Sequence, residues 1–249
     1  MRIRHVKIHN FRSVRDVDVD VSDMLILLGP NNHGKSNILS AIEFGLSTGT
    51  KPTVDDLCAT ADSEDRSLWV EFTFAELTPQ EQTTFQKYRR NDNSIRIRKT
   101  AMFDDSASST ITYQGYVEEP EEWWLKGTAF ERLQKKELIQ AEADKVPELS
   151  TLLEAGGKVT KQRIADFQLE YIEKHRETLT FTEVLEVGPL LGAKNVAGGV
   201  LPDFYLVPAV RDLSDETKTK GTTVFGRLLQ RAVQEMTAHD PQFLDLQRR

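Results

Sequence analysis

Cysteine is almost absent from this chain, since Cys58 is the only one among 249 residues. A disulfide framework is therefore excluded, and so is a zinc site built on several cysteine ligands. Such a composition suits a reducing compartment, which predicts a cytoplasmic protein.

Long apolar runs are missing as well. No stretch approaches the roughly 18 consecutive apolar residues of a membrane-spanning helix, so the sequence predicts no membrane span. The first residues, MRIRHVKIHNF, alternate and carry charges, so they do not resemble a signal peptide with an apolar core.

The chain also lacks an excess of positive charge. It has 32 lysines and arginines against 39 aspartates and glutamates, which gives a formal net charge of −7. The chain as a whole is therefore not a cation that binds polyanions. Contact with DNA would have to come from a local basic patch or from segments outside these residues.

Patterns of metal ligands are equally scarce. The five histidines are scattered, and none has a second ligand at metal-binding spacing. Asp16, Asp18 and Asp20 alternate with valines, but an EF-hand would need glycine at Val21 and glutamate at Leu27. We interpret the aspartates as the solvated face of an edge strand, and the sequence predicts no catalytic residue.

What the sequence does contain is a phosphate-binding glycine loop. Residues 29–36 read GPNNHGKS and fit the pattern G-x-x-x-x-G-K-[ST]. The apolar run at 24–28 (MLILL) predicts a buried strand before the loop, and the apolar spacing of 37–47 predicts a helix after it. A chance match in a glycine turn is the alternative, and the flanking strand and helix argue against it.

The loop predicts a site for ATP and Mg²⁺. Backbone N–H groups and the positive end of the helix would cradle phosphates, Lys35 would reach the β- and γ-phosphates, and the Ser36 hydroxyl would ligate Mg²⁺. His33 is not predicted to be catalytic, because side chains within such loops usually point outward. The predicted nucleotide-binding residues of the loop are Gly29, Pro30, Asn31, Asn32, His33, Gly34, Lys35, Ser36 and Asn37.

Alternating residues and turn signals predict an antiparallel layer beside the loop. The predicted strands are residues 3–11, 14–21, 67–76, 94–103 and 109–117. Thr78-Pro79-Gln80-Glu81 has the capping-box pattern that begins a short helix.

The second half of the chain reads as mostly helical. Charged helical patterns fill residues 121–178, where Trp123-Trp124 caps a small core or, alternatively, offers a surface for stacking nucleobases. Glycines mark residues 186–200 as a loop. Residues 203–210 predict a second buried strand, and residues 222–238 a closing helix.

Together these patterns predict an α/β fold: a P-loop core with an added antiparallel β layer and a helical segment. Residues 1–120 would form the ATPase lobe with its antiparallel layer, and residues 121–200 a helical insertion. Residues 201–249 would supply a return strand and helix of the ATPase core.

The opening of the chain resembles SMC, RecF and related ABC-type ATPase heads. Between two predicted strands it carries Asn10-Phe11-Arg12-Ser13, and the glycine loop then follows, an order and spacing found in those heads. This resemblance covers residues 1–48 and implies that Arg12 approaches the nucleotide. An exposed turn arginine is the alternative.

Within that group the chain is most similar to the OLD (overcoming lysogenization defect) family. Residues 201–213, LPDFYLVPAVRDL, read as a strand ending in P-A-x-R-D, similar to the end of the ATPase portion of those proteins. The similarity implies a homodimer of heads that sandwiches ATP and gates an endonuclease acting on DNA, in DNA repair or phage defence. The alternatives are an SMC- or RecF-like repair head without nuclease and a nucleotide-binding assembly module that never hydrolyses ATP.

The chain also departs from these families. It has no S-G-G signature, no Walker B run ending in Asp-Glu, no switch histidine and no Q-loop glutamine near residues 208–211. The carboxylates of a Toprim nuclease domain are missing too. We therefore expect an N-terminal piece or a split subunit that binds ATP, hydrolyses it poorly alone and has no nuclease activity.

Overall fold

The computed structural model of the chain describes residues 1–60, 62, 64–133, 135–154, 159–192, 200–207, 226, 228–231 and 233. Two predicted features lie wholly or mostly outside these residues: the P-A-x-R-D segment at 208–212 and the closing helix at 222–238.

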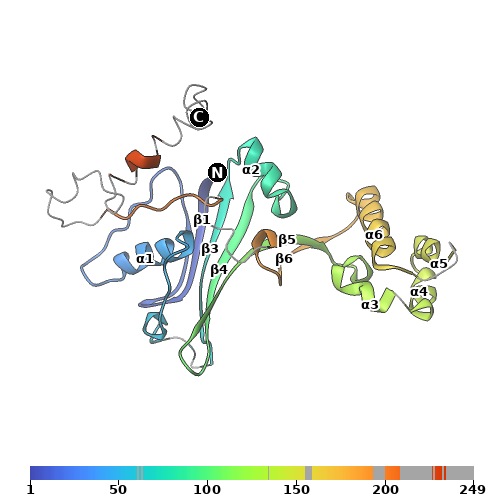
Figure 1. Cartoon of the computed structure of the whole chain (residues 1–249), viewed down its shortest axis with the longest axis horizontal. Coiled ribbons are helices and arrows are strands. Elements are labelled where there is room, and N and C mark those ends of the chain that lie inside the picture. Colours follow the sequence, from blue (N-terminus) through green and yellow to red (C-terminus); the bar gives the residue numbers. More distant parts are fainter. Residues whose placement is uncertain are drawn as a thin grey trace, which may run out of the picture.

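Six strands form one antiparallel sheet in the order β2-β1-β3-β4-β5-β6 (Figure 1). The strands are β1 (Arg2–Phe11), β2 (Val14–Asp20), β3 (Ser67–Ala75), β4 (Ile95–Phe103), β5 (Ser109–Pro120) and β6 (Phe181–Leu185). Alternation predicts the first five, because a strand whose two faces meet different surroundings repeats every two residues. The predicted antiparallel layer is thus confirmed, and β6 is a strand that the sequence analysis missed.

One helix, α1 (Lys35–Leu46), packs against the sheet through β1 and β3. The short helix α2 (Pro79–Thr84) begins with the predicted capping box, in which Thr78 and Glu81 each accept a hydrogen bond from the other's backbone N–H. Further α-helices among the described residues are α3 (Phe130–Leu133), α4 (Lys136–Ala143), α5 (Thr151–Glu154) and α6 (Lys161–His175).

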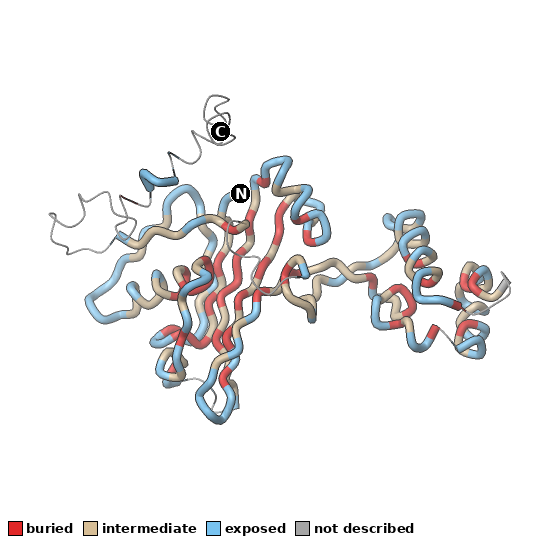
Figure 2. Tube along the Cα trace, in the orientation of Figure 1, coloured by how far each residue is buried: buried red, intermediate tan, exposed pale blue. Residues whose placement is uncertain are grey.

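The main hydrophobic core lies between α1 and one face of the sheet (Figure 2). Val6 and Ile8 of β1 and Val70 and Phe72 of β3 are buried there. Gly45 of α1 comes so close that a β-carbon on it would lie 2.4 Å from the Phe72 ring. The absence of a side chain at Gly45 therefore sets how closely α1 approaches the sheet.

The opposite face of the sheet is polar. Asp16, Asp18 and Asp20 are exposed on the edge strand β2, and Asp18 pairs with Lys7 of β1 at 2.8 Å. This arrangement confirms that the three aspartates form the solvated face of an edge strand. Among the described residues, no group of three or more His, Cys, Asp or Glu side chains is placed to hold a metal ion.

A helical lobe is inserted between β5 and β6, which extend from the sheet as a two-stranded ribbon (Figure 1). The lobe has its own hydrophobic core, which includes Trp124, Leu133, Ile139 and Ile164. Trp124 meets Tyr171 edge-on, with 4.7 Å between the ring centroids. Trp124 therefore packs the small core, as the first of the two interpretations of this tryptophan pair predicts.

The predicted buried strand at 24–28 is wrong for the described structure. These residues form no strand, and Met24, Ile26 and Leu28 are 73%, 66% and 88% exposed. A strand needs a partner strand, and residues 24–28 pair neither with the open edge of β2 nor with that of β6. The segment at 203–207, the described part of the second predicted buried strand, forms no strand either.

Lys99 of β4 is buried at the end of α1. Its Nζ donates hydrogen bonds of 2.7 Å to the carbonyl oxygens of Phe44 and Ser47. The last carbonyls of a helix have no partners within the helix, so a cation placed there can satisfy their hydrogen-bonding capacity by donating to them. The negative end of the helix dipole also attracts a cation. Lys99 therefore anchors α1 to the sheet at the end opposite the glycine loop.

Lys99 should give the fold a measurable dependence on alkaline pH. Burial lowers its pKa from 10.5 to about 8. A cation with a lowered folded-state pKa destabilises the fold while protonated, and this penalty is relieved as the pH rises from about 8 toward 10.5. The free energy of unfolding of the wild type minus that of Lys99→Met should therefore increase between pH 8 and 10, by on the order of 2 kcal/mol. Urea denaturation of both proteins measures the difference, and a constant value would contradict the prediction.

Candidate nucleotide-binding site

The glycine loop runs directly into α1 and adopts backbone conformations that favour glycine. Gly34 has φ 82° and stands at the N-cap of α1, where a β-carbon would lie 2.9 Å from Ser13 Oγ. Gly29 has φ 153° and Asn32 has φ 62°, both in the positive region that most residues avoid. The sequence of the loop is therefore matched to its shape.

The start of α1 leaves its first backbone N–H groups without a side-chain cap. No side chain caps this end of the helix, and its first turn contains no acidic residue. The early N–H groups of a helix have no partners within the helix, so an uncapped start combined with the helix dipole attracts anions. Residues 31–37 line a polar hollow of about 430 Å³ at this point.

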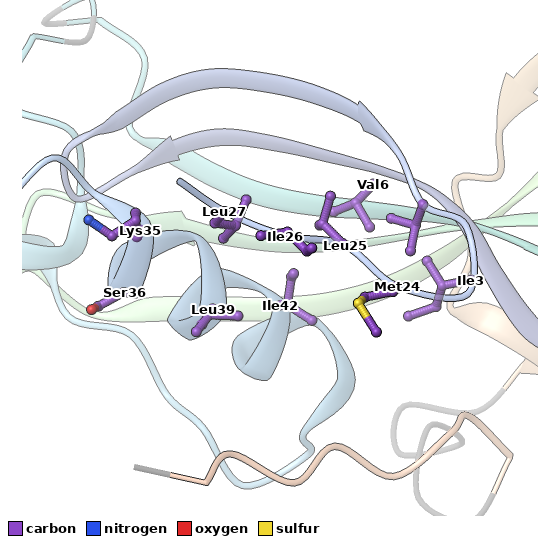
Figure 3. A pocket seen from close by; sticks show the side chains of 11 residues that line it. Ile3, Val6, Met24, Leu25, Ile26, Leu27, Lys35, Ser36, Leu39 and Ile42 are labelled. Carbon is purple, nitrogen blue, oxygen red and sulfur yellow. The ribbon is translucent and has the colours of Figure 1, made fainter. Parts of the chain in front are cut away.

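Lys35 and Ser36 lie at the start of α1, at one end of an apolar trough between that helix and residues 24–27 (Figure 3). The Lys35 Nζ donates hydrogen bonds to the carbonyl oxygens of Gly29 and Pro30, at 2.7 Å and 2.6 Å. Ser36 is exposed. A lysine and an exposed serine thus lie beside the uncapped helix end.

The segment Asn10-Phe11-Arg12-Ser13 is docked against this loop. Asn10 is buried, and its side chain donates to the Asp65 carboxylate at 2.8 Å. Phe11 stacks on Phe44 of α1, and Ser13 Oγ accepts a 2.8 Å hydrogen bond from the Asn37 side chain. Each of these residues therefore ties the turn between β1 and β2 to its surroundings.

Arg12 itself is bound by an aspartate and not by the loop. Its Nε donates to Asp56 Oδ1 at 2.7 Å, and its backbone N–H donates to the Asp56 carbonyl at 2.7 Å. Burial raises the pKa of Asp56, but hydrogen bonds from Thr53 and Arg12 outweigh burial and hold that pKa below its ordinary value. The guanidinium thus faces an ionised carboxylate.

The structure brings together the predicted residues 29–37 in one loop and places Arg12 on the adjoining turn. His33 is exposed, with Nδ1 2.8 Å from the Asn31 carbonyl oxygen. Sequence reasoning missed Ser13 and Asp56. The only signal for Asp56 was its position three residues after Thr53, the spacing of a capping box.

Comparison with known proteins gave one family. A family model described as an AAA ATPase domain matches residues 1–247. No curated protein matches the sequence. Across the described residues, every helix is too short or too polar to cross a membrane.

Proposed function

Because the chain belongs to the AAA ATPase domain family, we propose that its glycine loop, residues 29–36, binds ATP together with Mg²⁺. The observation that carries the proposal is the uncapped N-terminus of α1, which begins directly at this loop. Backbone donors, a helix dipole and a lysine converge there, which is the arrangement that binds the phosphates of a nucleotide.

The residues of the loop would divide the work between phosphates and metal. Lys35 would pair with the β- and γ-phosphates, and Ser36 would supply a hydroxyl ligand to Mg²⁺. When bound, Mg²⁺ neutralises phosphate charge. The proposed nucleotide-binding residues are Arg12, Gly29, Pro30, Asn31, Asn32, His33, Gly34, Lys35, Ser36 and Asn37, and the proposed metal ligand is Ser36.

We further propose that the chain is the ATPase portion of an OLD-family protein that acts on DNA as a homodimer of heads. The order of the Asn10–Ser13 segment and the glycine loop supports an SMC- or RecF-related head, and residues 201–213 favour the OLD family. Reading the gene beyond Arg249 tests this proposal. A Toprim domain there supports the OLD family, and a long heptad coiled coil supports an SMC-type head instead.

Titration of the chain with ATP and Mg²⁺ tests nucleotide binding. Lys35→Ala removes a charge-assisted contact to phosphate, so the affinity should fall by about 1.5–3 kcal/mol, or roughly 10- to 150-fold. Lys145→Ala is the matched control, because Lys145 is exposed in the helical lobe. Equal affinities of the wild type and Lys35→Ala would overturn the proposed site.

A further inference from the structure

Asp56 lies outside the glycine loop and the Asn10–Ser13 segment, yet it holds Arg12, whose neighbour Ser13 contacts the start of α1. We propose that Asp56 is a positioning residue, which fixes the Arg12 guanidinium so that its terminal nitrogens meet the phosphates of a bound nucleotide. This inference rests on the proposed nucleotide-binding function.

Backbone hydrogen bonds connect the segment around Arg12 to the segment around Asp56. The Arg12 N–H donates to the Asp56 carbonyl, and the next contacts along the chain extend this pairing: Phe11 forms an antiparallel bridge with Leu57, and the Cys58 N–H donates to the Asn10 carbonyl at 3.0 Å. Arg12 has φ 53°, a left-handed conformation that costs energy in a non-glycine residue. The turn therefore holds an unfavourable conformation because residues 56–58 bind it.

The carboxylate of Asp56 is also held by a second partner besides Arg12. Its Oδ2 accepts a 2.8 Å hydrogen bond from the Thr53 N–H, at the start of a short 3-10 helix of residues 54–56. Its Oδ1 then accepts from Arg12 Nε. The side chain of Asp56 is 17% exposed, so this geometry is protected from water.

Binding through Nε leaves one edge of the guanidinium unused. Among the described residues, neither terminal nitrogen of Arg12 has a hydrogen-bond partner, and the Arg12 side chain is 44% exposed. The pair of terminal nitrogens is the edge that binds phosphate in a bidentate manner. A carboxylate on Nε therefore restricts the arginine without competing for that edge.

The loop lies directly beside this arginine. Ser13, the next residue, accepts the hydrogen bond from Asn37 in the first turn of α1, and it lies where a β-carbon on Gly34 would project. The backbone at Arg12 is thus fixed relative to the uncapped helix end. A ligand with several phosphates is the chemistry that would contact both the loop and this guanidinium.

A double-mutant cycle tests the proposal. ATP affinity in the presence of Mg²⁺ would be measured for the wild type, Arg12→Ala, Asp56→Asn and the double variant, with thermal unfolding recorded for each. Arg12→Ala should weaken binding about tenfold, and Asp56→Asn about fivefold. The double variant should bind no more weakly than Arg12→Ala, because Asp56 acts through Arg12.

Two further variants separate positioning from general effects. Asp55→Asn removes the same charge from the neighbouring, exposed residue and should leave the affinity within about twofold of the wild type. Arg12→Lys keeps the charge but lacks the planar pair of terminal nitrogens, so it should bind ATP about as weakly as Arg12→Ala.

Several outcomes would overturn the proposal even if Lys35→Ala weakens ATP binding as expected. Asp56→Asn and Asp55→Asn could weaken binding equally, or Asp56→Asn could weaken it as much in the Arg12→Ala background as alone. Tighter binding by Asp56→Asn would show that Asp56 competes with phosphate. If the wild type bound no ATP at all, the proposed function itself would fail.

Discussion

Replacing Glu71 with alanine should lower the free energy of unfolding by about 3 kcal/mol, the low end of the cost of breaking a buried ion pair. Glu71 lies in the middle of the sheet and is 1% exposed. Its carboxylate accepts hydrogen bonds from Arg96 at 2.5 Å, from Arg98 at 2.9 Å and from Tyr116 at 2.6 Å. Alanine would leave the two half-buried guanidinium groups without their shared counter-charge.

Urea denaturation measures this loss, with Glu118→Ala as the matched control. Glu118 lies on β5 of the same sheet and pairs with the half-exposed Arg176 at 3.4 Å, so its loss should cost less than about 1 kcal/mol. Equal effects of the two substitutions would contradict the central role of Glu71.

Acid should abolish the same contribution. Burial raises the pKa of Glu71, but the Tyr116 hydroxyl and the charges of Arg96 and Arg98 outweigh burial, so the pKa lies below its ordinary value. A carboxylate with a lowered folded-state pKa stabilises the fold above its unfolded pKa of about 4.3 and loses that effect as the pH falls through the folded value. The difference between the wild type and Glu71→Ala should therefore shrink below about pH 4.

Gly45→Val should destabilise the fold by about 3 kcal/mol and weaken ATP binding from a distance. A side chain at Gly45 would meet the Phe72 ring at 2.4 Å and Val70 at 3.1 Å, and both partners are fully buried. Helix propensity favours most residues over glycine by up to about 1 kcal/mol, which is too little to offset this overlap. Because α1 carries Lys35 and Ser36, any shift of the helix moves the proposed phosphate site.

Gly49→Ala is the control for this substitution. The nearest atom to a β-carbon on Gly49 is the Ser47 hydroxyl oxygen at 3.9 Å, so alanine should change stability by less than about 0.5 kcal/mol. Thermal unfolding and ATP titration of both variants measure the effects. A Gly45→Val protein as stable as Gly49→Ala would show that α1 moves away without cost.

Local sequence patterns predicted much of the secondary structure. They could not predict which distant segments pair with one another. Strands β1 to β5 and the cap of α2 follow from residues adjacent in sequence. The apolar run at 24–28 looked like a buried strand for the same local reason. Whether such a run becomes a strand depends on pairing with a distant segment, and no described strand pairs with this one.

The candidate site likewise has a part that local sequence predicts and a part that depends on distant contacts. A contiguous motif revealed the glycine loop, whereas Asp56 contacts a residue 44 positions away, and its only local signal is the capping-box spacing from Thr53. The sequence pattern around Lys99 does indicate a buried charge. The alternation of Ile95, Ile97, Lys99, Ala101 and Phe103 places a lysine on the buried face of β4, where a charged residue needs a dedicated partner.

The helical lobe has a consequence for how this protein can evolve. It enters and leaves the sheet at Pro120 and Phe181, which lie opposite each other in the β5–β6 ribbon, and it packs around a core of its own. An insertion whose two ends meet can be lengthened, shortened or exchanged by recombination without repacking the host. Related chains can therefore acquire new lobes at this position while the sheet, α1 and the glycine loop stay unchanged.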